Sequence, residues 1–399
     1  MPTPCIQWHR NARIFAGVEE VLPVVGTPAA TILAQPVSAA LNAIHTALTT
    51  GTPFCVSDTA LPDMDHIPPA HFATLTGGTS GAPKVILRSQ ASWVASFKTN
   101  AAQFGYRPQD SIAVLGGLNH SLALYGVLEG VHLGLSVHIL SALRPSDQSA
   151  QLRAHRCSVL YATPTQLRML PATMPLADVR LILCGGGSLG AQTRRHITAL
   201  CPNAALHVFY GAAETSFVTM SDDNAPEGSV GRAYPDVEIA VRNPDDTGTG
   251  VIWVRSPYLL EGYLQGESDH TRRDGDWLTV GEYGHINPEG YLFLQGRAGR
   301  VVNFADTTIF PEALEAQFSA LEGITHCTVL ARLDALRGHH LVAVIAGDED
   351  AQQRDMLLKH CKAQGIKGLR DVVFLDPYPL LTSGKPDLQR IATLTGCVL

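Results

Sequence analysis

The chain has 399 residues, a formal net charge of −7 at pH 7 and 45% hydrophobic residues. This composition excludes a disordered chain, and the length favours two domains, each with its own core. The acidic balance, without a local cluster of lysine and arginine, excludes the electrostatic footprint of a nucleic-acid-binding protein.

Eight cysteines are scattered without a C-x-x-C pair, and the sixteen histidines form no H-E-x-x-H pattern. These patterns predict buried or free thiols in a reducing compartment rather than disulfides or a structural metal site. Residues 1–14 lack the apolar core of a signal peptide, and no run approaches the ~18 apolar residues that a membrane helix needs. We therefore expect a cytoplasmic protein that binds neither membranes nor nucleic acid.

Apolar periodicity predicts layers of strands and helices over the first half of the chain. Residues 1–36 are cut by prolines and predict no clear element, whereas residues 37–49 have helical spacing and 53–56 form a short strand candidate. Further strands are expected at 85–87, 111–115, 137–140, 159–162 and 179–184, and helices at 92–104, 125–133, 148–155 and 165–170. This alternation argues for an α/β fold.

After Gly231 the pattern changes to a mainly β section, followed by a compact α+β unit. Strands are expected at 238–241, 251–255 and 291–294, then a helix at 311–321, strands at 327–331 and 341–346, a helix at 350–364 and a strand at 372–375. A charged turn at 297–300 marks the boundary. The prediction is a large layered α/β domain over residues 1–297 and a small α+β domain over 298–399.

The stretch L-T-G-G-T-S-G-A-P-K at residues 75–84 is typical of a loop that binds phosphates. Its glycines let backbone N–H groups approach an oxyanion, Thr76, Thr79 and Ser80 add hydroxyl donors, and Lys84 adds a positive charge. The apolar residues after Lys84 suggest that the loop turns between two strands. It does not match G-x-x-x-x-G-K-[ST], and by itself the string is equally typical of a surface turn.

Five further motifs follow this loop. They are C-G-G-G-S-L at 184–189, F-Y-G-A-A-E-T at 209–215, G-E-Y-G at 281–284, G-Y-L-F-L-Q-G-R at 290–297 and L-L-T-S-G-K-P-D at 380–387. Together and in this order, the motifs resemble the adenylate-forming superfamily. That superfamily includes acyl- and aryl-CoA synthetases, adenylation domains of nonribosomal peptide synthetases and firefly luciferase. The resemblance covers roughly residues 37–399.

The resemblance implies an enzyme that activates a carboxylic acid with ATP. The carboxylate attacks the α-phosphate, giving an acyl-adenylate and pyrophosphate, and a thiol then takes the acyl group. Such a step needs positioning and charge neutralisation more than covalent help. ATP and Mg²⁺ are the implied cofactors, and coenzyme A or the phosphopantetheine of a carrier protein is the implied acceptor.

The same resemblance assigns residues to the nucleotide. The phosphate loop would hold the β- and γ-phosphates, and two of its residues, Lys84 and Thr79, would be catalytic. The loop residues assigned to the phosphates are Thr76, Gly77, Gly78, Thr79, Ser80, Gly81 and Lys84. Gly185, Gly186 and Gly187 would let the backbone approach the adenine. Tyr210, followed by Gly211, would stack on the adenine ring, and Glu214 would bind Mg²⁺ through hard oxygen ligands.

Three later residues complete the implied site. Glu282 stands where the family has an aspartate that accepts hydrogen bonds from both ribose hydroxyls, and Arg297 matches an arginine that also contacts the ribose. Lys385 matches the catalytic lysine of the C-terminal S-G-K motif, whose charge bridges the substrate carboxylate and the phosphate.

The chain also departs from the family pattern. Gly77 replaces a serine, Ala213 replaces the usual Thr or Ser before Glu214, and Gly299 takes the hinge position that is normally Asp or Lys. The turn at 303–308 lacks the family's glycines, which leaves coenzyme A and a carrier protein both open as acceptors. The phosphate loop also lies unusually early, so the N-terminal part of the large domain is truncated relative to the family, and a homodimer partner could cover the exposed edge.

The segment G-G-L-N-H-S-L at 116–122 stands where the family begins its acyl pocket. Two alignments are possible. In one, His120 matches the histidine of an F-H-x-x-G pattern that lines the acyl or thiol path; in the other, Asn119 matches the asparagine that hydrogen-bonds a ring hydroxyl in aryl-acid enzymes. By the same resemblance, Gly211 would also face the substrate. The segment lacks an aspartate, which argues against an α-amino acid. We expect an aryl or short hydrophobic acid, with a buried turn of no ligand role as the alternative.

A second hypothesis comes from a different class. The short N-terminal part, Ala213 and the altered turn after the hinge are also typical of a catalytically impaired homologue kept as a binding or partner subunit. Retention of Lys84, Glu214 and Lys385 argues for the enzyme.

Overall fold

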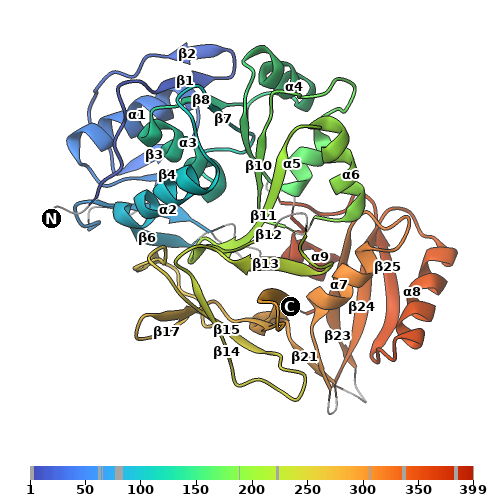
Figure 1. Ribbon diagram of the computed structural model, residues 1–399. Helices are drawn as coiled ribbons and strands as arrows, with labels where there is room; N and C mark the ends of the chain where they lie inside the picture. Colours follow the sequence, from blue (N-terminus) through green and yellow to red (C-terminus); the bar gives the residue numbers. More distant parts are fainter. Residues whose placement is uncertain are drawn as a thin grey trace.

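The computed structural model describes residues 4–61, 64, 66–76, 84–187, 189–221, 224–304, 307–334, 338–381 and 385–398. A large part built of sheets and covering helices forms the N-terminal three quarters of the chain, and a small domain with its own sheet lies beside it (Figure 1). This arrangement confirms the predicted mixed α/β fold with a large and a small domain.

The larger sheet of the described residues runs through the whole large domain. In spatial order its strands are β17 (Arg272–Asp274), β18 (Trp277–Thr279), β15 (Gly250–Arg255), β19 (Glu282–Ile286), β20 (Tyr291–Arg297), β13 (Ser229–Ala233), β12 (Ser216–Ser221), β11 (Ala205–Ala212), β10 (Leu181–Cys184), β9 (Val159–Ala162), β7 (Ser111–Val114), β8 (Ser136–Ile139), β1 (Arg13–Ala16) and β2 (Glu19–Val21), with β14 (Glu238–Arg242) paired to β15. The strands from β11 to β1 are parallel, and the rest pair antiparallel.

The parallel strands β7, β9 and β10 are buried along their whole length, as expected for continuous apolar runs that helices cover on both faces. These helices are α2 (Gln90–Gln103), α3 (Ser121–Leu133), α4 (Pro145–Ala154), α5 (Pro164–Met169) and α6 (Ala191–Leu200). Helix α3 packs against β7, β8 and β9. Two glycines let this helix lie close to the sheet. A Cβ at Gly126 would come within 2.9 Å of the Tyr161 ring, and one at Gly130 would come within 2.4 Å of Val137.

A second sheet holds the two strands that flank the phosphate loop. Its order is β16 (Gly262–Gln265), β6 (Val85–Ser89), β5 (His71–Leu75), β4 (Cys55–Ser57) and β3 (Thr31–Leu33), and α1 (Val37–Thr50) packs on β3. β5 and β6 pair antiparallel with Leu75 opposite Val85. This pairing confirms the predicted arrangement of two strands around the loop, of which residues 77–83 lie outside the described residues.

The small domain has its own cores on both faces of a three-stranded sheet. It contains β21 (Val302–Phe304), β22 (Thr307–Ile309), α7 (Pro311–Ser319), β23 (Cys327–Asp334), β24 (Gly338–Ala346), α8 (Ala351–Ala363), β25 (Leu369–Leu375) and α9 (Leu388–Thr395). A 3₁₀ turn at Ala298–Arg300 follows β20 at the predicted boundary. We keep residues 1–297 and 298–399 as the proposed domains.

Exposed apolar side chains gather in the first 35 residues, around the edge strands β2 and β3. Val18, Leu22, Val24, Val25 and Leu33 are about half exposed or more, with Leu22 at 78%. The homodimer expected to cover such an edge stays a prediction. Within the described ranges, no helix combines the length and the apolar character needed to cross a bilayer.

A fully buried carboxylate, that of Glu129 on α3, lies in the core of the large domain. Asn100 Nδ2 donates to its Oε1 at 2.8 Å, and the hydroxyls of Tyr161 and Tyr106 donate to its Oε2 at 2.6 and 3.2 Å. The Tyr234 hydroxyl donates to Asn100 Oδ1 at 2.6 Å and extends the network. Burial raises the pKa of Glu129 to about 7, although these hydrogen bonds favour the ionised form.

We expect Glu129 to make the fold less stable as pH rises. The carboxyl titrates near 4.5 when unfolded and about 7 when folded, so the folded state binds the proton more tightly between these values. The free energy of unfolding should therefore fall by about 2.5 kcal/mol from pH 5 to pH 8 through this group. Glu129→Gln should remove this part of the slope in urea unfolding, whereas Glu322→Gln, at an exposed carboxylate, should keep it. Equal slopes in wild type and Glu129→Gln would contradict this assignment.

Candidate active site

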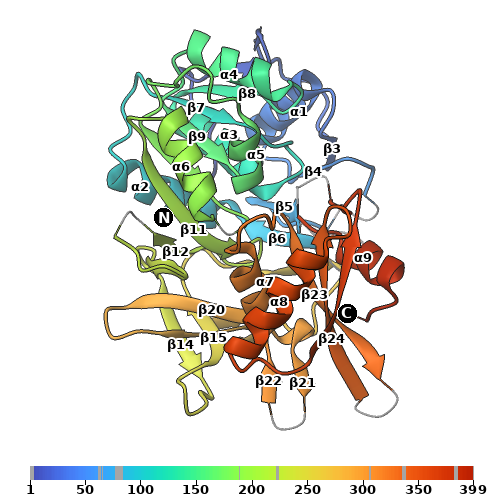
Figure 2. The same cartoon turned by 90° about the vertical axis from the view of Figure 1, so that its right-hand side faces the viewer.

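The carboxyl ends of four neighbouring parallel strands bring the predicted ligand segments to one edge of the large sheet. β7 leads into the segment with Asn119 and His120, β9 into Thr163, β10 into Gly185, and β11 carries Tyr210. In open α/β sheets, ligands bind outside such strand ends. Figure 2 shows the small domain turned towards the viewer, below helices α5 and α6, which follow β9 and β10.

The predicted adenine and ribose residues lie together. β19 and β20 place Glu282 opposite Arg297, and Arg297 Nε donates to Glu282 Oε1 at 2.8 Å. Burial raises the pKa of Glu282, and the charge of Arg297 opposes this shift. Burial also raises the pKa of the Tyr210 hydroxyl, on which the charges of Glu282, Arg297 and Glu214 all act. The structure therefore brings these four predicted residues to one site.

Lys385 reaches this site from the small domain. Burial lowers the pKa of Lys385, the charge of Arg297 lowers it further and that of Glu282 raises it. The Lys385 charge also lowers the pKa of His120. The ammonium thus lies within electrostatic range of both the ribose pair and the predicted acyl segment. Its neighbours in the motif, residues 382–384, lie outside the described residues.

The predicted phosphate lysine and the predicted metal ligand meet at Tyr263, which the sequence analysis missed. Lys84 N–H donates to Thr76 Oγ1 at 3.1 Å, and Thr76 N–H donates to Lys84 O at 3.0 Å, which closes the base of the loop. Lys84 Nζ lies 5.8 Å from the centre of the Tyr263 ring, within range of a cation–π contact. The Tyr263 hydroxyl donates to Glu214 Oε1 at 2.9 Å. The other loop residues assigned to phosphate, Gly77, Gly78, Thr79, Ser80 and Gly81, lie outside the described residues.

Arg88, a second residue that the sequence analysis missed, holds the segment before Glu214. Its side chain is fully buried on β6; Nη1 donates to Tyr258 O at 2.8 Å and Nη2 donates to Ala213 O. Burial lowers the pKa of Arg88 to about 10, and the charge of Glu214 opposes this shift. Glu214 O in turn accepts from Leu260 N–H at 2.8 Å. The strand after the phosphate loop is thereby tied to the loop that carries Glu214.

The departure at Ala213 has a packing reason. Its methyl group packs against the apolar cluster of Ile86, Leu260 and Leu278. A threonine or serine here would place a hydroxyl against apolar side chains, which costs free energy unless the hydroxyl finds a partner.

The glycines of two motifs are required by close contacts. A Cβ at Gly185 would lie 2.1 Å from the Phe209 ring, and one at Gly211 would lie 1.8 Å from Ser216 O. Gly186 has φ +86°, a left-handed conformation that favours glycine. Gly187 lies beside Pro164, which follows β9. The roles of these glycines towards adenine and substrate stay predictions.

The predicted acyl segment contacts a residue from the second sheet. Asn119 Nδ2 donates to Asp58 Oδ2 at 2.6 Å, and Asp58 directly follows β4. Burial lowers the pKa of His120; the charge of Asp58 raises it and that of Lys385 lowers it. The segment itself lacks an aspartate, as the sequence shows, but the sheet order brings Asp58 beside it from far earlier in the chain.

Glu214 fits the role predicted for a magnesium ligand. Tyr263 occupies Oε1, and no hydrogen bond from a described residue reaches Oε2. In the described part of the chain, no group of three or more His, Cys, Asp or Glu side chains could hold a metal by itself. This donor set suits Mg²⁺, which takes one or two carboxylates and completes its coordination with phosphate oxygens and water.

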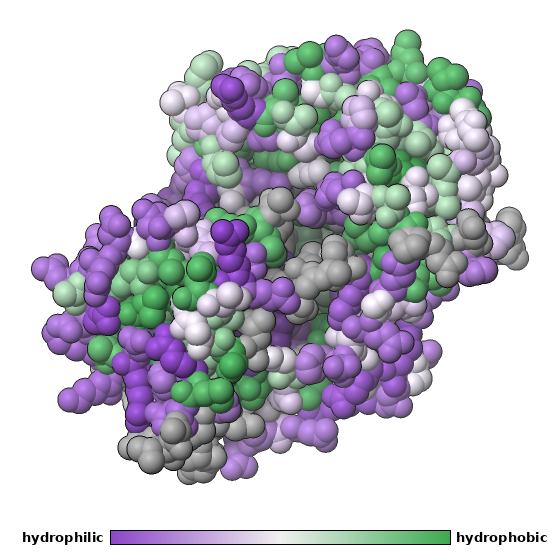
Figure 3. All heavy atoms as spheres, turned by 180° about the vertical axis from the view of Figure 1, so that it is seen from behind, coloured by the Kyte–Doolittle hydropathy of each residue, from purple (hydrophilic) through white to green (hydrophobic). Residues whose placement is uncertain are grey.

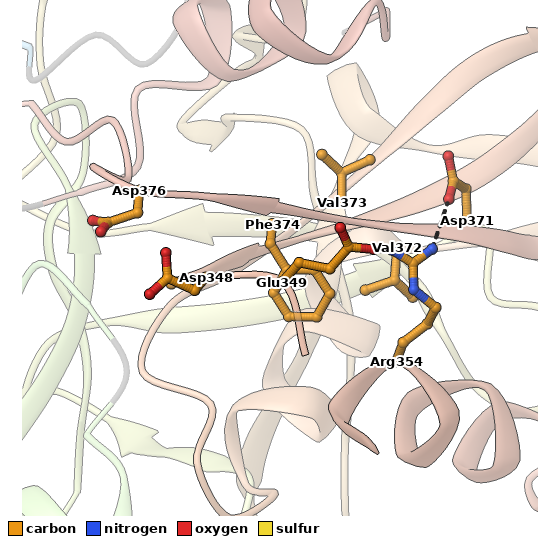
Figure 4. A pocket seen from close by; sticks show the side chains of 9 residues that line it. Asp348, Glu349, Arg354, Asp371, Val372, Val373, Phe374 and Asp376 are labelled. Carbon is orange, nitrogen blue, oxygen red and sulfur yellow. Dashed lines mark hydrogen bonds and ion pairs between the residues drawn. The ribbon is translucent and has the colours of Figure 1, made fainter. Parts of the chain in front are cut away.

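Two cavities of the described residues lie away from these side chains. One of about 370 Å³ lies on the small domain between α8 and β25, where Arg354 pairs with Asp371 beside Asp348 and Glu349 (Figure 4). Another of about 310 Å³ lies by the turn after β20. Neither contains a predicted site residue. Seen from behind, the surface is hollowed where the small domain, at lower left, meets the large one (Figure 3).

The comparisons with known proteins agree with the motifs. The model of the AMP-binding enzyme family matches residues 25–264. An uncharacterised acyl-CoA ligase, YhfT of Bacillus subtilis, is 30% identical over 349 residues, which cover 84% of this chain and 71% of that protein. A putative long chain fatty acid-CoA ligase, VraA of Staphylococcus epidermidis, is 28% identical over 302 residues, which cover 73% of this chain and 64% of that protein.

A solved structure shows the same fold. The o-succinylbenzoate CoA synthetase MenE of Bacillus subtilis, in complex with its acyl-adenylate intermediate, has a TM-score of 0.70 and 21% identity over 80% of this chain and 68% of that chain. The family match covers more than half of this chain, and YhfT reaches 30% identity over most of both proteins. The chain belongs to the AMP-binding enzyme family, the adenylate-forming superfamily of ligases that its ordered motifs resemble.

Proposed function

We propose that this protein joins a carboxylic acid to a thiol in two steps, through an acyl-adenylate formed from ATP. One observation carries the proposal: Arg297 pairs with Glu282 at 2.8 Å, and both lie within electrostatic range of Tyr210 and of Lys385 from the small domain. Cationic, anionic and aromatic groups from strands far apart in the sequence thus surround one place, as a nucleotide and a carboxylate require.

In the first step, a carboxylate oxygen of the acid attacks the α-phosphorus, and the bond to pyrophosphate breaks. Lys385 lies within electrostatic range of the ribose pair and of the acyl segment, so its ammonium can neutralise charge on both reacting groups. Lys84, at the base of the loop, would neutralise negative charge on the leaving pyrophosphate. Glu214 would hold Mg²⁺, whose charge neutralises the phosphate oxygens.

The ribose is assigned to Glu282 and Arg297. Arg297 Nε occupies one oxygen of Glu282, Oε1, which leaves Oε2 for the ribose hydroxyls. The side chain of Glu282 is 7% exposed and that of Arg297 is 54% exposed, so the pair presents the arginine towards solvent and the nucleotide. The extra methylene of glutamate relative to the family's aspartate is accommodated by this pairing.

In the second step, the acceptor thiol attacks the acyl carbon and AMP leaves. The proposed domains meet at the turn Ala298–Arg300, where a Cβ at Gly299 would lie 2.8 Å from His270 Nε2. Glycine suits both this close contact and a swivel of residues 298–399 between the steps. Coenzyme A and a carrier-protein phosphopantetheine remain alternative acceptors, and a short hydrophobic or aryl acid remains the proposed substrate.

Pyrophosphate exchange with a panel of carboxylic acids tests the proposal. We expect ATP-dependent exchange with at least one aryl or short acid, followed by thioester formation when coenzyme A or a phosphopantetheinylated carrier protein is added. The yield with each acceptor then identifies the thiol. Absence of exchange with every acid, together with retained ATP binding, would favour the catalytically impaired homologue instead.

A further inference from the structure

We propose that Asp58 and Asn119 form a subsite that selects acids carrying a hydrogen-bond donor, a hydroxyl or an ammonium group, on the acyl part. This inference rests on the proposed function and names its substrate class. Asn119 is a family position, whereas Asp58 belongs to none of the motifs and reaches the site from β4.

The geometry of Asn119 is fixed from two sides. Its Oδ1 lies over Gly117, where a Cβ would come within 2.6 Å of it, and its Nδ2 donates to Asp58 Oδ2 at 2.6 Å. The following residues are also anchored, because Ser121 Oγ donates to Leu75 O at 3.2 Å, at the end of β5. β5 lies next to β4 in the second sheet, so the contact with Asp58 belongs to a rigid frame.

Asp58 retains hydrogen-bonding capacity at the site. No described residue donates to its Oδ1, and the side chain is exposed rather than packed away. Asp58 and Lys385 both act on His120, with opposite signs. His120 therefore lies within electrostatic range of both an anion, Asp58, and a cation, Lys385.

An acid bound with its carboxylate at Lys385 extends its acyl part past His120 towards Asp58. A purely apolar acyl part would remove water from the Asp58 carboxylate without giving it a donor, and such unpaired burial is costly. A hydroxyl or ammonium group on the acid restores the lost hydrogen bond. The position of Asp58 therefore predicts discrimination against the bare hydrocarbon acid.

The test compares matched acids in pyrophosphate exchange: butyrate, 3-hydroxybutyrate and 3-aminobutyrate, and benzoate, 3-hydroxybenzoate and 3-(aminomethyl)benzoate. In at least one series, we expect wild type to prefer a donor-bearing acid over its parent by roughly 10- to 100-fold in kcat/KM. Asp58→Asn should reduce this preference by a similar factor, more for the ammonium than for the hydroxyl acid. Asp147→Asn, at an exposed site on α4, should leave it unchanged.

The outcomes separate this inference from the proposed function. Exchange that favours the parent acids, or an Asp58→Asn variant that lowers kcat/KM equally for all acids, would overturn the subsite and leave the proposed function standing. Exchange with no acid at all would overturn both. A preference that Asp58→Asn shifts towards the parent acids supports the subsite and excludes a purely structural role, which would affect all acids equally.

Discussion

Replacing Lys385 by glutamine is expected to lower the rate of pyrophosphate exchange by about 10²- to 10³-fold, the loss usual when one group that stabilises a developing oxyanion is removed. The charges of Arg297 and Glu282 act on Lys385, and that of Lys385 acts on His120; in the proposed function, the Lys385 charge serves the reacting carboxylate and phosphate. Glutamine keeps much of the length and polarity but lacks the charge. Thioester formation from a supplied acyl-adenylate should change far less, because no pyrophosphate leaves in that step.

The pH profile gives a second readout for Lys385. Burial and Arg297 lower its pKa, so the ammonium loses its proton at lower pH than an ordinary lysine. Exchange by wild type should decline on the alkaline side as this charge is lost, and Lys385→Gln should lack that decline. Lys367→Gln, at an exposed lysine of the small domain, should behave as wild type. A fully active Lys385→Gln variant would show that this lysine does not serve the first step.

Replacing Glu214 by glutamine is expected to weaken Mg²⁺ binding at this site. Glutamine keeps an oxygen that can accept from Tyr263 but removes the negative charge that suits Mg²⁺. The Mg²⁺ concentration for half-maximal exchange should rise by at least about 10-fold, since even residues that only orient metal ligands have effects of that size. Titration of Mg²⁺ at saturating ATP measures this shift.

Glu267→Gln is a matched control, since Glu267 is an exposed carboxylate near the end of β16. It should leave the Mg²⁺ dependence unchanged. Identical Mg²⁺ titrations for wild type and Glu214→Gln would remove Glu214 from the metal site, and Tyr263 would then only position the phosphate lysine.

The sequence predicted the parallel centre of the fold well, because β7, β9 and β10 are continuous apolar runs buried on both faces. It missed β2 and β3, which have three residues each and lie in a stretch broken by prolines. Strands this short carry too little periodicity to be recognised. β2 pairs with the adjacent strand β1, and β3 pairs with β4, so each is recognised only through its partner strand.

The residues of the candidate site also divide into those that the sequence predicted and those that it missed. Tyr210, Glu214, Glu282, Arg297 and Lys385 stand in recognisable motifs, and the structure brings them together.

The residues that the sequence analysis missed are supplied by neighbouring strands. Tyr263 reaches Glu214 because β16 pairs with β6, and Asp58 reaches Asn119 because β4 lies beside β5. Arg88 carried a signal, an arginine directly after an expected apolar strand, and so did Asp58, a carboxylate two residues after another expected strand. Which strands are neighbours depends on long-range pairing, and local sequence does not specify it.

The central claim is that the acid's own oxygen attacks the α-phosphorus of ATP. An acid that supports exchange, labelled with ¹⁸O in both carboxylate oxygens, tests this claim directly when the products of complete turnover with ATP and the acceptor thiol are analysed by mass spectrometry. An acyl-adenylate predicts that one ¹⁸O is transferred to AMP. Unlabelled AMP, or ADP together with labelled inorganic phosphate, would contradict it.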